Sequence, residues 1–123
     1  MASRPKYLNL LLIRMPLPAI VSIMHRISGA ALFLALPLML WWLQQSLTSN
    51  RTFAEFQTLF SNPLVKLVVI ALLWGYMHHL CAGIRHVVMD MHYGLELKTV
   101  RLTSMLVLGV SVALTAVIGA LLW

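Results

Sequence analysis

Charge is scarce in this chain of 123 residues, and acidic charge above all. Asp, Glu, Lys and Arg together make up 10% of the residues, and only Glu55, Asp90 and Glu96 are acidic. Hydrophobic residues make up 61%, and the mean hydropathy is +0.90. A soluble domain of this length could not bury so much apolar side chain, because small domains keep a large share of their residues at the surface. The scarcity of charge therefore excludes a water-soluble globular protein and predicts an integral membrane protein.

Cysteine and a cleavable leader are also lacking. The single cysteine, Cys81, excludes a disulfide framework within the chain, and we expect it to be a small packing residue. A basic N-terminus does precede an apolar run, but that run is too long for a signal peptide and no small-residue cleavage site follows it. We therefore expect the first apolar segment to remain in the mature protein.

Long apolar runs, by contrast, are plentiful, and three of them are long enough to cross a bilayer, which needs about 20 residues of helix. They predict an all-α integral membrane fold with one domain, residues 1–123, and transmembrane helices at about 22–47, 63–91 and 102–123. Pro37 predicts a mild kink in the first helix, which membrane helices tolerate. The polar segment between the first two spans predicts a short surface helix around 52–60.

The basic residues predict the orientation of these spans. Their excess gives a formal charge of +6, but they are scattered through loops and helix ends, so we expect no nucleic acid partner. Seven fall on the side of the N-terminus and of the second connection: Arg4, Lys6, Arg14, Arg26, Arg85, Lys98 and Arg101. Only Arg51 and Lys66 fall on the other side. The positive-inside rule then puts the N-terminus in the cytoplasm and the C-terminus in the periplasm.

The second span carries ionisable side chains that a lipid-facing helix would avoid. His79, Gly83, His86 and Asp90 follow an i, i+4, i+7, i+11 spacing, so they line one face of the helix. Ionisable groups at membrane depth are costly and usually face a bundle interior or a cofactor. Two imidazoles with a gap at Gly83 between them suit a flat, metal-bearing ring.

Haem b fits this face, because iron binds neutral imidazole nitrogen and the two haem propionates attract cations. His79 is the expected ligand, and the alternative is a hydrogen-bonded structural histidine. His78 is the competing ligand, but it lies about 100° around the helix, on a stripe with Arg85, and we expect it to face another helix. The propionates should point to a shallower layer of polar groups, which comprises His25, Arg26, Arg85, His86 and Asp90.

A second polar group lies on the first span, where Ser22, His25, Arg26 and Gly29 share a face at i, i+3, i+4, i+7. A hydroxyl, an imidazole and a cation near the interface suit a quinone headgroup, whose carbonyls need donors and whose reduction consumes protons. The alternative has Arg26 reaching lipid phosphate and Ser22 capping the helix. Asp90 is either a proton-delivery carboxylate or an ion-pair partner, for example of Arg85 or Arg101.

These motifs resemble the cytochrome b subunit of bacterial succinate dehydrogenase, the succinate:quinone oxidoreductase of respiratory complex II. The resemblance rests on Arg4-Pro5, on Ser22-Ile23-Met24-His25-Arg26-Ile27-Ser28-Gly29, and on His79-x-x-x-Gly83-Ile84-Arg85-His86 followed by Asp90. The first of the longer motifs matches the family pattern S-I-x-H-R-x-[ST]-G. Length and the number of spans agree as well, so the resemblance covers essentially the whole chain.

The resemblance implies a four-subunit complex in the bacterial inner membrane, active in the tricarboxylic acid cycle and aerobic respiration. A flavoprotein and an iron–sulfur protein would sit on two small anchors, of which this chain is one and a second three-helix subunit is the other. His79 would be one axial ligand of a haem b shared with the second anchor. Ser22 and Arg26 would bind ubiquinone, His25, Arg26 and His86 would surround the haem propionates, and Asp90 would lie near the proton entry.

The resemblance makes this chain a subunit of an enzyme and not its catalytic head, because it has no flavin fingerprint and no cysteine cluster. Two rival functions stay open. The first is a fumarate reductase anchor that uses menaquinone. The second is a small transporter or assembly protein that binds no haem and uses the polar stripe as a proton relay.

Overall fold

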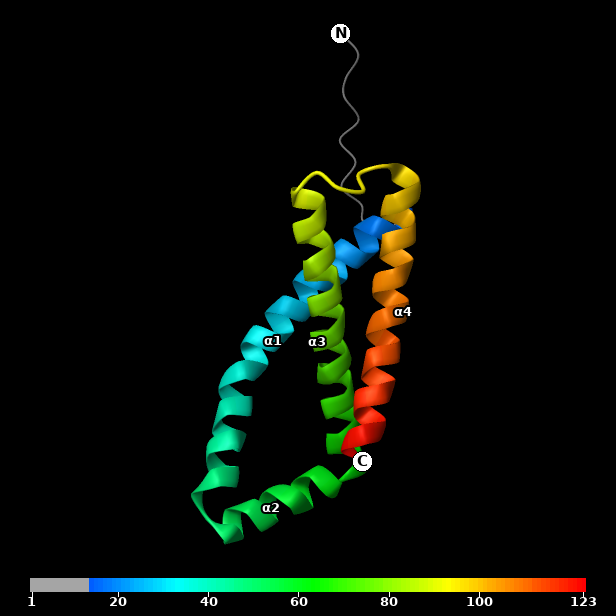
Figure 1. The fold of residues 1–123 in the computed structure, drawn as a ribbon. Coiled ribbons are helices and arrows are strands. Elements are labelled where there is room, and N and C mark those ends of the chain that lie inside the picture. The colour runs from blue at the N-terminus through cyan, green and yellow to red at the C-terminus, as the bar shows by residue number, and fades with distance from the viewer. Residues whose placement is uncertain (1–13) are drawn as a thin grey trace.

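The computed structural model describes residues 14–123, which form four helices and, within that range, no strand. They are α1 (Leu17–Thr48), α2 (Asn50–Ser61), α3 (Pro63–Asp90) and α4 (Leu97–Leu122) (Figure 1). All but the short α2 are long and apolar enough to cross a membrane. The predicted all-α fold with three spans is thereby confirmed.

The predicted helix boundaries are right for α3 to within one residue, but α1 and α4 each begin five residues earlier than the apolar runs suggested. α1 begins after Pro16, whose extended backbone takes the N-cap position, and Pro18 occupies the first turn, where a missing N–H costs nothing. α4 begins at Leu97, so its first turns carry Lys98 and Arg101. Hydropathy marks only the apolar part of a helix, whereas these polar first turns are helical as well.

α2 confirms the short helix predicted between the first two spans. It begins with a capping box, in which the Ser49 hydroxyl accepts a hydrogen bond from the Thr52 N–H and the Thr52 hydroxyl accepts one from the Ser49 N–H. Asn62 then ends α2 and begins α3, because its side-chain oxygen accepts the Leu64 N–H at 2.9 Å. These two caps fix the points at which the chain changes direction between α1 and α3.

The helices are arranged as a close α3–α4 pair crossed obliquely by α1 (Figure 1). The first half of α1 packs on this pair and its second half leads away from it, and Pro37 lies inside the helix. α2 then returns the chain to the start of α3. The start of α1 and the α3–α4 connection therefore lie at one end, here called the loop end, and α2 and the C-terminus lie at the other, the α2 end.

The packed core lies where α1, α3 and α4 meet. Val21, Ala82 and Val107, one from each helix, form its buried centre, and Cys81 and Leu108 pack against it, as expected for a small packing cysteine. The buried stripe of α4 is built from small hydroxyl residues as well as Val107: Ser104, Ser111 and Thr115. Each hydroxyl donates to a carbonyl three or four residues earlier in α4, so it is buried with its hydrogen bond made. Small side chains of this kind let membrane helices approach closely.

Outside this core many apolar side chains are exposed. Along the second half of α1, Phe33 is 74% exposed and Leu34 is 76% exposed. A helix with apolar residues on every side requires an apolar environment, which lipid or another membrane subunit provides.

Candidate functional site

Three imidazoles come together where α1 crosses α3. The His25 ring from α1 stacks on the His79 ring from α3, with 4.2 Å between centroids and 11° between planes. The His86 ring, also from α3, lies next to the His25 ring, with 5.1 Å between centroids and 49° between planes. The structure therefore brings together two predicted stripes from different helices, and the deeper and shallower polar layers are in direct contact at His25.

The His79 ring is held by two hydrogen bonds from α1. Its Nδ1 lies 3.1 Å from the carbonyl oxygen of His25 and 3.4 Å from the hydroxyl oxygen of Ser28. The Ser28 hydroxyl itself donates to the same His25 carbonyl at 2.9 Å. A carbonyl can only accept, so Nδ1 of His79 carries the proton. In the neutral ring, Nε2 then holds the free lone pair.

Gly29 gives the His79 ring its place against α1. A Cβ atom at Gly29 would lie 2.8 Å from Cε1 of His79, closer than real contacts allow, and 3.2 Å from Nδ1, a tight contact. Any larger residue at this position would displace the ring from the helix surface.

The gap expected at Gly83 is already filled from α1. A Cβ atom at Gly83 would meet Nε2 of His25 at 3.5 Å, so the His25 imidazole covers this glycine. This part of the sequence interpretation, an open space at Gly83 for a flat ring, is wrong for this structure. The spacing within one helix could not reveal it, because the side chain that fills the space belongs to another helix.

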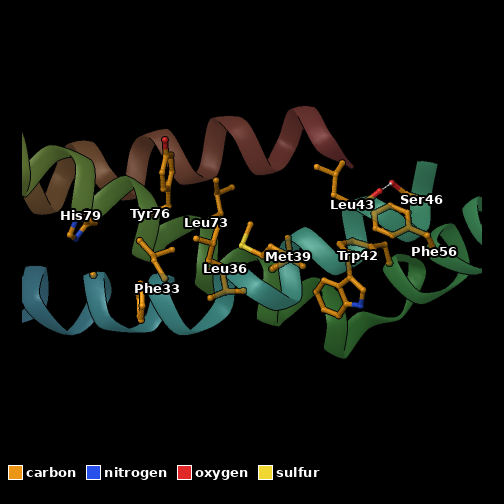
Figure 2. Close-up of a pocket in the computed structure, with 15 residues that line it drawn as sticks. Phe33, Leu36, Met39, Trp42, Leu43, Ser46, Phe56, Leu73, Tyr76 and His79 are labelled. Atoms are coloured by element: carbon orange, nitrogen blue, oxygen red, sulfur yellow. Dashed lines mark hydrogen bonds between the residues drawn. The ribbon is translucent and has the colours of Figure 1, made fainter. Parts of the chain in front are cut away.

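A large apolar cavity opens beside His79. It has a volume of about 690 Å³ and lies between the diverging part of α1, α2 and α3, with His79 at one end (Figure 2). Gly29, which lies against the His79 ring, also lines it. Apolar side chains such as Leu36, Met39 and Leu73 line its length, and Trp42 and Phe56 stand at the far end (Figure 2). Among residues 14–123, no charged residue lines it. An imidazole at the end of an apolar cavity has the chemistry that a metal-bearing, largely apolar ring requires.

His78 lies on a different side of α3 from His79. It is only 1% exposed, and its ring lies 5.7 Å from that of Trp74. Neither ring nitrogen of His78 has a hydrogen-bond partner within the described residues. The expectation that His78 faces the packing between helices is confirmed, and it does not line the cavity.

Ser22 and Arg26 both lie on the first turns of α1, near the loop end. Ser22 is half-buried and Arg26 is exposed. The alternative in which Ser22 caps the helix is wrong, because the N-cap is Pro16 and Ser22 stands more than a turn inside α1. The Ser22 hydroxyl therefore does not serve the helix end.

Asp90 is the last residue of α3 and is exposed at the loop end. Within residues 14–123 the only ion pair joins Arg51 and Glu55, so the proposed pairing of Asp90 with Arg85 or Arg101 is absent from this part of the chain. Arg85 instead reaches α4, as described next. The carboxylate of Asp90 therefore faces the surroundings of the helix bundle at this end.

Arg85 is the polar residue whose role the sequence did not reveal. Its side chain is 7% exposed, and Nε donates to the Thr103 hydroxyl at 3.0 Å while a terminal nitrogen donates to the Val100 carbonyl at 3.4 Å. The sequence did contain a sign of this burial, because Arg85 shares a helix face with His78 and that face of α3 is buried. Arg85 thus joins α3 to the first turns of α4 and does not belong to the exposed cationic layer.

Among the described residues, no group of three or more His, Cys, Asp or Glu side chains is arranged to hold a metal ion. Of the imidazoles in the described residues, that of His79 is the one that lines the apolar cavity.

Comparison with known proteins adds independent evidence about the family of this chain. Residues 2–118 match the family described as succinate dehydrogenase/fumarate reductase transmembrane subunit. The chain is 37% identical to the succinate dehydrogenase cytochrome b556 subunit of Coxiella burnetii over 123 residues, which cover 99% of this chain and 98% of that protein. The subunits of the same name from Paracoccus denitrificans and Rickettsia felis are 37% identical over 112 residues and 33% identical over 120 residues. These cover 91% and 98% of this chain, and 86% and 90% of the relatives.

Proposed function

The chain belongs to the succinate dehydrogenase/fumarate reductase transmembrane subunit family, and we propose that it anchors a succinate dehydrogenase, binds haem b and helps form a ubiquinone-reduction site. It is a multi-pass protein of the bacterial inner membrane, with three apolar helices. The names of its relatives favour the succinate dehydrogenase member of the family and a b-type cytochrome. The tricarboxylic acid cycle and the aerobic respiratory chain are the pathways in which it would act.

The observation that carries the haem proposal is the state of His79. Its Nδ1 is engaged by α1, its Nε2 is free, and its ring stands at the end of an apolar cavity. Neutral imidazole is the usual protein ligand of haem iron in such sites. A bound haem b would supply a one-electron carrier at this position. This chain would give one axial ligand, and the second anchor subunit would give the other.

Cationic and polar groups at the loop end support the placement of the haem propionates. His25 and His86 form the edge of the imidazole cluster, and Arg26 follows His25 on the exposed side of α1. Propionates carry negative charge, and a cation within a few ångströms stabilises them more strongly in an apolar surrounding than in water. With the N-terminus in the cytoplasm, this edge would lie toward the cytoplasmic surface.

The same end of α1 supports the quinone proposal. The Ser22 hydroxyl is available as a donor to a quinone carbonyl, and the Arg26 guanidinium would stabilise the negative charge that the headgroup gains on reduction. Asp90, exposed at the end of α3, is a candidate for delivering protons from the cytoplasmic side. Electrons would come from an iron–sulfur subunit docked at this surface, which in turn would receive them from a flavoprotein.

The exposed apolar faces support a second anchor subunit as the neighbour of α1 and α3. The cavity beside His79 is open between α1 and α3, so the ligand histidine is accessible from the side on which a partner helix would lie. A partner there would also cover apolar side chains such as Phe33, which are exposed in the single chain.

The experiment that tests this function uses the complex purified through a tag on this chain. We expect a flavoprotein, an iron–sulfur protein and a second small membrane subunit to co-purify, and a reduced-minus-oxidised spectrum to show a b-type haem. Absence of the haem would favour the transporter or assembly alternative. Enzymatic activity with menaquinone but not ubiquinone would favour the fumarate reductase alternative.

Arg26→Leu separates quinone chemistry from assembly. We expect ubiquinone reduction by succinate to fall at least tenfold, while succinate oxidation by an artificial acceptor stays unchanged, since a lost charge contact in such a site costs roughly 1.5–3 kcal/mol. Arg101→Leu is the matched control, because Arg101 is also an exposed arginine near the loop end, but on α4. If Arg26→Leu lowers both activities together, Arg26 serves assembly and not the quinone.

A further inference from the structure

Three features within one turn of α1 define the position of the His79 ring. The His25 carbonyl accepts from Nδ1, the Ser28 hydroxyl lies beside the same nitrogen, and Gly29 leaves the surface of α1 bare where the ring rests. We propose that this α1 seat, His25 carbonyl with Ser28 and Gly29, selects the Nδ1–H tautomer of His79 and presents Nε2 as the iron-binding nitrogen. The inference rests on the proposed function for the identity of the metal, but not for the tautomer.

The geometry explains why a glycine follows the serine. In a helix the carbonyl of residue i is directed toward residue i+4, so the His25 carbonyl lies beneath position 29. A side chain at position 29 would cover that carbonyl, and even a methyl group would stand 2.8 Å from Cε1 of His79. To restore ordinary contact, the ring would have to withdraw by about half an ångström, away from the acceptor that its Nδ1 uses.

Ser28 adds a second constraint to the same nitrogen. Its hydroxyl hydrogen is used by the His25 carbonyl at 2.9 Å, so the hydroxyl oxygen turns its lone pairs outward. Nδ1 at 3.4 Å then meets an acceptor and not a donor. The His25 carbonyl requires a proton on Nδ1, because a proton on Nε2 instead would leave that carbonyl facing a lone pair; the Ser28 hydroxyl adds a second acceptor as long as it donates to the same carbonyl.

The hydrogen bond made by Nδ1 of His79 would also influence an iron bound at Nε2. A histidine ligand that donates its other N–H to a carbonyl is held in one orientation and becomes a stronger donor to the metal. A stronger donor would favour oxidised iron, so the seat would lower the midpoint potential of a haem bound at Nε2. Ser28 and Gly29 thus act as positioning residues through His79, without touching the haem themselves.

The direct test is the protonation state of His79 in the full chain without haem. The chain, labelled with ¹⁵N-histidine and placed in lipid nanodiscs, is examined by NMR, with His79→Gln identifying the signals. We expect a protonated Nδ1 and an unprotonated Nε2 in the native chain. Gly29→Ala should convert this into a mixture of tautomers. A native His79 protonated on Nε2, or a Gly29→Ala chain with unchanged signals, would overturn the proposal.

A second test uses the assembled complex and controls matched to each substitution. Gly29→Ala is compared with Gly75→Ala, a helical glycine in α3 where an added Cβ meets nothing within 4 Å. Ser28→Ala is compared with Ser61→Ala, because the Ser61 hydroxyl makes the same kind of bond, to the carbonyl three residues earlier, but at the end of α2 and outside the cavity lining. Ser28→Thr keeps the hydroxyl and serves as the rescue.

We expect Ser28→Ala and Gly29→Ala to shift the ferric low-spin EPR signal, and Gly29→Ala to move the midpoint potential in the positive direction or to lower the haem content. The two controls and Ser28→Thr should keep the native signal. Equal shifts in the controls would overturn the proposal. If Gly29→Ala prevents assembly, Ser28→Ala and the NMR measurement still decide. A native complex without haem would refute the proposed function while leaving the tautomer result intact.

Discussion

Arg85 offers a quantitative test of how α3 and α4 are held together. Its guanidinium is almost fully buried and donates to the Thr103 hydroxyl at 3.0 Å and to the Val100 carbonyl at 3.4 Å. The first distance is that of an ordinary hydrogen bond, and the second is long and weak. We therefore expect most of the interaction free energy to come from the pair Arg85–Thr103.

The magnitude follows from measured hydrogen bonds between membrane helices, which contribute about 0.6 kcal/mol on average and about 1.7 kcal/mol at most. Arg85→Met keeps the length of the side chain and should lower the free energy of unfolding by about 1–2 kcal/mol. Thr103→Val removes the acceptor with little change of shape. The double variant should show a coupling energy of about 1 kcal/mol, because each single variant already removes the same bond.

The assay is unfolding of the purified chain in mixed micelles, with helix content followed by circular dichroism across a titration with a denaturing detergent. Arg101→Met is the control, since Arg101 is an exposed arginine on α4 and its loss should change stability by less than about 0.5 kcal/mol. The reasoning is refuted if the coupling energy is near zero, or if Arg101→Met costs as much as Arg85→Met.

Two further predictions concern packing and helix capping. Ser111→Leu inserts three carbons at a fully buried position of α4 and should destabilise the chain by about 1–3 kcal/mol in the same assay. Ala113→Leu, on the exposed side of α4, should not destabilise it. Equal effects would mean that the buried stripe is placed on the wrong side of α4. Ser49→Ala removes the capping box of α2 and should cost about 0.5–2 kcal/mol, seen as faster amide hydrogen exchange in α2, whereas Thr58→Ala should leave that exchange unchanged.

The sequence was sufficient to predict the three membrane spans and to predict which residues share a face of α3. Apolar runs located the three long helices, and the 3.6-residue period correctly put His79 and His86 on one face of α3 and His78 on another. Hydropathy failed at the starts of α1 and α4, because helices continue into polar segments that hydropathy ignores.

The relations between helices could not be predicted from the sequence. The period of a helix gives the direction of its side chains but not the height at which a neighbouring helix crosses it. Hence the sequence suggested an open space at Gly83, whereas the crossing puts the His25 ring there. The same limit hid the two bonds from α1 to Nδ1 of His79 and the reach of Arg85 to α4, since all of them depend on how the helices are aligned.

The central claim, that His79 holds haem iron, is tested most directly by the reduced-minus-oxidised spectrum of the purified complex carrying His79→Tyr. His92→Asn is the control, because His92 lies in the α3–α4 connection with a positive φ of 66° that asparagine also tolerates. We predict that His79→Tyr abolishes or shifts the b-type bands while the other subunits still co-purify, and that His92→Asn keeps the native spectrum. An unchanged spectrum in His79→Tyr would contradict the account.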